Sequence, residues 1–106
     1  MIFDSLLIAN RGEIACRIIK TAREMGIRSI AVYVDADKNS LFVKNADESI
    51  RLKDGGYLDG NQIIKAAKIS GAQAIQPGYG FLSENASFAR QVKKEKIIWV
   101  GPSPNV

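Results

Sequence analysis

The most unusual stretch for chemistry is the sequence Pro-Gly-Tyr-Gly-Phe at residues 77–81, which directly follows a predicted strand. Its two glycines would let the backbone approach a ligand closely, and Tyr79 would offer that ligand a ring face and a hydroxyl group. The structural alternative is a turn between a strand and a helix, in which Phe81 and Leu82 fill the core. The residue types and their spacing fit both interpretations equally.

Two aspartates, Asp35 and Asp37, follow the second predicted strand, roughly where a dinucleotide-binding fold places the acid that binds the ribose. The first turn, however, has only Gly12 where that fingerprint needs three glycines. A phosphate-accepting receiver domain would need a further acid after the first strand and a lysine after the last, and this chain has Asn10 and Gly101 there. The aspartates are therefore interpreted as turn-forming residues.

Two absences exclude several classes of site. The sequence contains no histidine and one cysteine, Cys16. A zinc site of cysteine and histidine ligands cannot be built, nor can a Ser-His or Cys-His nucleophile pair. An internal disulfide is impossible, which fits a reducing compartment. Cys16 lies beside the apolar stripe of a predicted helix and is interpreted as a packing residue.

The composition is that of an ordinary soluble domain. The chain has 106 residues, of which 46% are hydrophobic and 25% charged, and it predicts a single domain over residues 1–106. The net charge of +4 is mild. The one dense basic group, at residues 93–96, fits the end of a helix better than a nucleic-acid patch. The apolar runs are too short for a membrane span, and because the first strand begins almost at once, we expect no targeting peptide before it.

Strand and helix patterns alternate along the chain without hairpin signals. This order predicts crossover connections and an α/β, Rossmann-like, doubly wound sheet of about five mainly parallel strands. The third strand alternates in polarity, which favours a position near an edge. Strands are predicted at residues 6–9, 29–34, 48–52, 73–76 and 96–100, and helices at 11–26, 40–46, 59–71 and 83–94.

Local signals predict how these helices begin and which side they bury. Asn10 with Glu13, and Asp59 with Gln62, have the spacing of a capping box, and Ser83 or its neighbour should cap the last helix, with Glu84 in its first turn. The first helix should turn one stripe toward the sheet. That stripe is Ala15, Ile18, Ile19, Ala22 and Met25, and the solvent side carries Arg17, Lys20 and Glu24.

Two longer motifs resemble the amino-terminal region of biotin carboxylase. They are Ile-Ala-Asn-Arg-Gly-Glu-Ile-Ala at residues 8–15 and Pro-Gly-Tyr-Gly-Phe-Leu-Ser-Glu-Asn-Ala at residues 77–86. Residues 35–37, 46–48 and 100–103 also match, and the resemblance runs from Ile2 to Val106. The sequence around Cys16 is most similar to the biotin carboxylase subunit of acyl-CoA carboxylases of the methylcrotonyl or propionyl type. Pyruvate carboxylase and urea carboxylase remain alternatives.

The resemblance implies a pre-ATP-grasp domain at the start of a longer chain. In that family, ATP, Mg²⁺, bicarbonate and biotin are bound mainly by later residues, and a biotin on a carrier protein is carboxylated through carboxyphosphate. By motif, Tyr79 and Gly80 would lie beside the biotin. Arg17, Lys20 and Glu24 match the helix face through which bacterial members dimerise, although a simply solvated face is the alternative.

The same resemblance implies partners and a location. The partners would be the ATP-grasp remainder of the chain, a biotin carboxyl carrier domain, a carboxyltransferase subunit and a second copy in a homodimer. Nucleic acid and membranes are not expected partners. The location would be the bacterial cytoplasm, or the mitochondrial matrix in a eukaryote.

Three departures from the family pattern stand out. Phe42 and Gln76 occupy positions where the family usually has histidine, and the connection between Leu52 and Tyr57 is shorter. The chain also has no phosphate-binding glycine loop with its lysine, no carboxylate cluster for magnesium and no clear general base. We therefore expect the segment to be inactive alone. A stand-alone Rossmann-like module that binds nucleotides or docks to proteins is the competing hypothesis.

Overall fold

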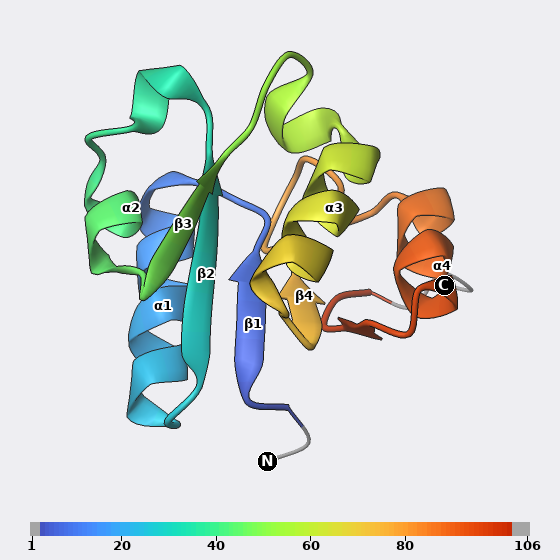
Figure 1. Cartoon of the computed structure of the whole chain (residues 1–106), viewed down its shortest axis with the longest axis horizontal. Coiled ribbons are helices and arrows are strands. Elements are labelled where there is room, and N and C mark those ends of the chain that lie inside the picture. The colour runs from blue at the N-terminus through green and yellow to red at the C-terminus, as the bar shows by residue number, and fades with distance from the viewer. Residues whose placement is uncertain (1–2, 103–106) are drawn as a thin grey trace.

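The short apolar runs of the sequence form one parallel five-stranded sheet in the computed structural model, which describes residues 3–102 (Figure 1). The strand order is β3-β2-β1-β4-β5, and every neighbouring pair is parallel. The predicted doubly wound parallel sheet and the edge position of the third strand are confirmed. The strands are β1 (Ser5–Ile8), β2 (Arg28–Tyr33), β3 (Glu48–Arg51), β4 (Ala74–Gln76) and β5 (Ile98–Trp99).

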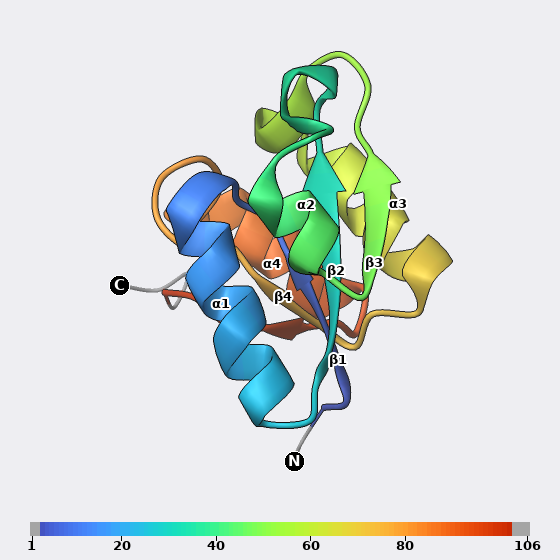
Figure 2. The ribbon, with the colours of Figure 1, turned by 90° about the vertical axis from the view of Figure 1, so that its left-hand side faces the viewer.

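Helices cover both faces of this sheet, as crossover connections require. Figure 2 shows α1 and α2 in front of the sheet, with α3 and α4 behind it. Two short 3₁₀ turns, Asp35–Asp37 and Gly56–Leu58, lie in the connections before α2 and α3. The helices are α1 (Gly12–Glu24), α2 (Leu41–Asn45), α3 (Gly60–Ser70) and α4 (Ala86–Lys94).

Alternate residues of the strands supply two separate hydrophobic cores, because successive side chains point to opposite faces. Leu7 and Ile75 pack with α3 and α4, whereas Leu6 and Ile8 pack with α1 and α2. Phe42 is 1% exposed in the second core. Its ring acts there as an apolar core group. No helix within residues 3–102 is both long and apolar enough to span a bilayer.

Most element boundaries differ from the sequence prediction by a residue or two, and in the last helix and the last strand the structure shows why. The last helix begins at Ala86 because the Asn85 side chain, and not that of Ser83, accepts a hydrogen bond from the Phe88 amide. Glu84 therefore precedes the helix and does not lie in its first turn. The last strand is limited to Ile98–Trp99, since Lys96 adopts a left-handed φ of 63° that no regular strand contains.

The apolar stripe of α1 is also narrower than predicted. Ala15, Ile19 and Ala22 are buried, but Ile18 is half-buried and Met25 is 50% exposed. The reason for Met25 is that α1 ends at Glu24, so Met25 is the C-cap residue and no longer follows the helical stripe. The predicted cap of α3 is confirmed, because the Asp59 side chain accepts a hydrogen bond from the Gln62 amide.

Candidate functional site

The turn that follows β4, residues 77–81, lies at the carboxyl edge of the sheet, where ligands of parallel α/β folds usually bind. Its backbone is strained. Gly78 and Gly80 have φ values of 67° and 66°, and Phe81, which has a side chain, has a φ of 47°. A left-handed conformation costs a non-glycine residue about 1–2 kcal/mol. At the tip of this turn, Tyr79 is 76% exposed.

Asn10, which follows the neighbouring strand β1, binds the backbone of this turn. Its side chain is 2% exposed, and its Nδ2 donates hydrogen bonds to the carbonyl oxygens of Pro77, at 2.8 Å, and Tyr79, at 2.5 Å. The N-cap of α1 is Arg11, without a side-chain hydrogen bond. The predicted Asn10–Glu13 capping box is therefore wrong, because the Asn10 Oδ1 accepts from the Arg11 backbone N–H and its Nδ2 donates across the sheet edge.

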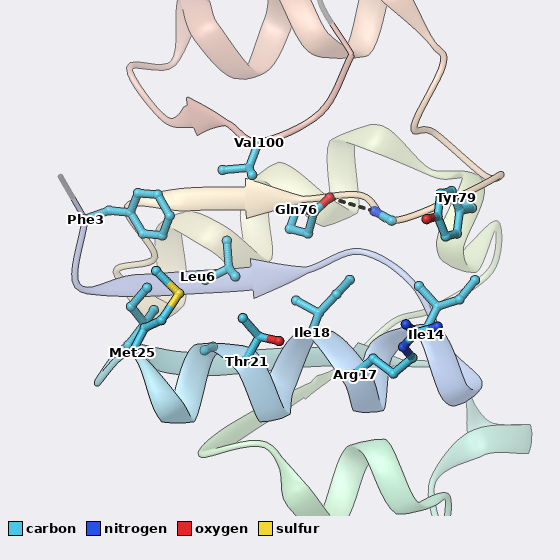
Figure 3. A pocket seen from close by; sticks show the side chains of 13 residues that line it. Phe3, Leu6, Ile14, Arg17, Ile18, Thr21, Met25, Gln76, Tyr79 and Val100 are labelled. Carbon is cyan, nitrogen blue, oxygen red and sulfur yellow. Dashed lines mark hydrogen bonds between the residues drawn. The ribbon is translucent and has the colours of Figure 1, made fainter. Parts of the chain in front are cut away.

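Gln76 holds the same turn through its side-chain amide oxygen. The Gln76 Oε1 accepts a hydrogen bond of 3.0 Å from the Gly78 backbone N–H, as the dashed line in Figure 3 marks. The turn also lies directly on Asn10, since a Cβ at Gly78 would come within 2.8 Å of the Asn10 Nδ2. Glycine is thus required at position 78 by both its φ and the space available. At Gly80 only the φ requires it.

A second set of contacts supports the other end of the turn. The Arg11 guanidinium forms a two-pronged ion pair with Asp37, with Nε 2.7 Å from Oδ2 and Nη2 2.5 Å from Oδ1. The Tyr57 hydroxyl donates to the same Oδ2 at 2.7 Å. The Tyr57 ring in turn packs on Phe81, with ring centroids 5.2 Å apart. Arg11 is therefore linked to Phe81 through two intervening side chains.

Arg11, Asp37 and Tyr57 lie close enough to shift one another's pKa values. The hydrogen bond from Arg11 lowers the pKa of Asp37, and burial works against that shift. The pKa of Tyr57 is raised, first by burial and then by the adjacent Asp37 carboxylate. At neutral pH the pair is ionised and the tyrosine hydroxyl remains a donor, so all three groups are matched.

The sequence predicted a turn role for Asp37, which its place in the 3₁₀ turn fits, but it missed the buried carboxylate and its partners. One signal could have found them. Asp37 and Arg11 each follow one of two predicted strands that neighbour each other in a parallel sheet. Their side chains therefore begin at the same edge.

A groove of about 530 Å³ runs between α1 and the strands β1 and β4, beside the turn, and Val100 lines it just after the end of β5. Figure 3 shows Ile14, Arg17 and Ile18 along the α1 wall, and Gln76 and Tyr79 on the opposite wall. The structure thus brings Arg17 and Tyr79 to one groove. Lys20 and Glu24 are exposed on α1, as predicted, but do not line it.

The described part of the chain offers little chemistry of its own. Within residues 3–102, no group of three or more histidine, cysteine or acidic residues could hold a metal ion. Cys16 is half-buried against the core of α1 and α2, which fits a packing role. What the site does offer is a fixed backbone turn whose most exposed aromatic ring, that of Tyr79, lies beside a largely apolar groove.

The whole chain matches known proteins closely. The family model described as "Biotin carboxylase, N-terminal domain" matches residues 2–106. The mitochondrial methylcrotonoyl-CoA carboxylase subunit alpha of Dictyostelium discoideum is 57% identical over 101 residues, which are 92% of this chain and 14% of that protein. The chain therefore spans about a seventh of the length of this relative, at 14% coverage.

Solved structures agree with this match. The Kluyveromyces lactis urea amidolyase is similar with a TM-score of 0.95 and 56% identity, covering 97% of this chain and 6% of that one. The biotin carboxylase domain dimer of the Hydrogenobacter thermophilus 2-oxoglutarate carboxylase, in complex with MgADP, ADP and bicarbonate, is similar with a TM-score of 0.93 and 42% identity. It covers 97% of this chain and 23% of that one.

Proposed function

Because the chain belongs to the biotin carboxylase N-terminal domain family, we propose that it is the first domain of a biotin-dependent carboxylase. The complete protein uses ATP and bicarbonate to carboxylate a biotin attached to a carrier. The low coverage of its relatives, 14% for the first curated one, supports a longer polypeptide in which this domain precedes the ATP-grasp module. The segment by itself has no activity.

The proposed contribution of this domain is one wall of the biotin site, made by Tyr79 and Gly80. The observation that carries it is the contrast at Tyr79, whose side chain is 76% exposed while its backbone carbonyl is held by the buried Asn10. An exposed ring on a fixed backbone can pack against the bicyclic ring of biotin with little loss of conformational entropy. The free space at Gly80, where a Cβ would meet nothing within 4 Å, lets a ligand approach the backbone.

ATP and Mg²⁺ bind elsewhere in the proposed enzyme. The residues present here do not fit them, because residues 3–102 contain no carboxylate cluster for a metal and the chain has no glycine-rich loop with a phosphate-binding lysine. When bound, Mg-ATP supplies the phosphoryl group that activates bicarbonate. This domain's own residues supply shape and orientation on the biotin side only.

The exposed side of α1 is proposed to meet a second copy of the enzyme. Arg17, Lys20 and Glu24 are all solvent-exposed on this helix, and they include both signs of charge, as a self-complementary contact needs. The related biotin carboxylase domain of the 2-oxoglutarate carboxylase is a dimer. The remaining proposed partners are a biotin carboxyl carrier domain and a carboxyltransferase subunit, in the cytoplasm of a bacterium or in a mitochondrial matrix.

A Tyr79→Ala substitution in the full-length protein tests the biotin wall. Removing the ring leaves the fold intact, since the side chain is exposed, but takes away the surface on which biotin packs. We expect kcat/KM for biotin to fall about 10-fold or more, as for loss of one good aromatic contact of about 1.4 kcal/mol, with the KM for ATP unchanged.

The matched control is Ile69→Ala, which removes another exposed hydrophobic side chain, 69% exposed on α3, on the opposite face of the sheet. This variant should carboxylate biotin like the wild type. Unchanged biotin kinetics in Tyr79→Ala would return the turn to a purely structural role. A wild-type protein unable to carboxylate biotin would contradict the proposed function itself.

A further inference from the structure

We propose that Asn10 is a positioning residue for biotin carboxylation, because it holds the backbone of the turn that carries Tyr79 and Gly80. The inference rests on the proposed function, since it concerns the same wall. Asn10 itself is buried and lies under the turn, so it acts through Tyr79 and does not touch the biotin.

The amide of Asn10 is matched completely by its surroundings. Its two N–H groups donate to the carbonyl oxygens of Pro77 and Tyr79, and its Oδ1 accepts a hydrogen bond of 2.8 Å from the Arg11 amide. Only a carboxamide presents two donors and an acceptor on so short a side chain. An aspartate has the same shape but no donor, so it would turn a negative oxygen toward two carbonyl oxygens.

The turn needs this external support. Gly78, Gly80 and Phe81 all have positive φ values, three within four residues, so no regular local hydrogen-bond pattern maintains the conformation. Ser83 and Asn85 donate backbone hydrogen bonds to the carbonyls of Gly80 and Leu82, which order only the far side of the turn. On the near side, the carbonyl of Tyr79 is held by Asn10.

Two consecutive residues therefore anchor the turn from both ends. Asn10 binds its beginning directly, and Arg11 supports its end through Asp37, Tyr57 and Phe81. The strand registers explain this arrangement. Ile8 of β1 lies opposite Gln76 of β4, so the residue two positions past the end of β1 reaches the turn that follows β4. The connection after the first strand thus serves a site formed 67 to 69 residues later in the chain.

The test is Asn10→Asp in the full-length protein, measured as biotin carboxylation and as KM for ATP. Loss of both donors frees the turn, and a misplacement of about 1 Å at a reacting group can lower the rate about 100-fold. We expect kcat for biotin carboxylation to fall about 10- to 100-fold, with the KM for ATP within about 2-fold of the wild type. A merely structural role would instead lower the apparent kcat only in proportion to the folded fraction, so that kcat per folded molecule would equal that of the wild type.

The matched control is Asn39→Asp, which makes the same chemical change at an exposed position. It should behave like the wild type. Asn10→Ser, which introduces no charge and retains one hydroxyl donor, decides the question if the aspartate variant does not fold, and we expect an intermediate fall in kcat with an unchanged KM for ATP.

An active wild type together with Asn10 variants that carboxylate biotin normally would overturn the positioning role while leaving the proposed function intact. A rise in the KM for ATP as large as the fall in kcat would overturn it as well. A wild type that is folded but does not carboxylate biotin would instead reject the proposed function.

Discussion

Asp35 and Asp37 lie two residues apart in the same 3₁₀ turn, and each pairs with an arginine, yet their environments are opposite. The side chain of Asp35 is 67% exposed and that of its partner Arg51 is 54% exposed. The side chain of Asp37 is 4% exposed, and its pair with Arg11 is completed by the Tyr57 hydroxyl. Two residues with the same predicted turn role therefore have different structural roles.

This difference in burial determines how much each ion pair contributes to the stability of the fold. An exposed pair gains little because water and salt screen it and both side chains lose freedom when they associate. A buried carboxylate must have partners, and removing it leaves those partners unmatched. Through Tyr57, the Asp37 pair also contacts Phe81 at the end of the turn that carries Tyr79. The Asp35 pair connects the 3₁₀ turn to Arg51, the last residue of the edge strand β3.

The largest effect is expected from Asp37→Ala, which removes the buried carboxylate. The buried Tyr57 hydroxyl then has no acceptor, and an unmatched buried hydroxyl costs about 1–3 kcal/mol. We expect the free energy of unfolding of the 106-residue chain to fall by about 2 kcal/mol. Urea denaturation followed by the fluorescence of Trp99, which packs edge-on against Phe88, measures it. A decrease below about 0.5 kcal/mol would mean that water replaces the carboxylate without loss.

A smaller loss of stability is expected when acid protonates Asp37. The folded state lowers the pKa of Asp37, chiefly through the Arg11 hydrogen bond, below the unfolded value of about 3.9. The ionised carboxylate thus stabilises the fold fully above that value, and the contribution is lost as pH falls through the folded-state pKa. We expect the urea midpoint of the wild type to fall more steeply below pH 4 than that of Asp37→Asn. Parallel curves would assign the acid loss to other acids, of which Asp35, Asp59 and Glu95 also have lowered pKa values.

The sheet and its helices could be predicted because they depend on patterns repeated over many residues. Alternating strand and helix signals fix a parallel order, and a wrong boundary such as Ser83 instead of Asn85 does not change it. The exposed α1 residues followed from helical spacing in the same way. The candidate turn was identified from its two glycines and Tyr79, and its exposure agrees with that choice.

What supports the turn could not be predicted, because it depends on single hydrogen bonds between distant residues. Asn10 followed by Glu13 has the local spacing of a capping box, and local spacing says nothing about the carbonyl oxygens of Pro77 and Tyr79. Likewise, Asp35 and Asp37 have the same local context, and only the packing of Tyr57 makes one of them buried. Residues with two possible partners, one local and one across the sheet, are those that sequence patterns assign wrongly.

The smallest effect on stability is expected from Asp35→Asn, which alters the exposed pair. The substitution removes the charge of the exposed pair but retains an oxygen that can accept from the Arg51 guanidinium. Because the pair is screened by solvent, we expect the urea midpoint of the 106-residue chain to equal that of the wild type within experimental error. A clear decrease would show that the 3₁₀ turn unfolds as a unit and that Asp35 helps to hold Asp37 in place. In that case the two aspartates would form one network, and the Asp37 pair could not be treated as independent of the exposed edge of the sheet.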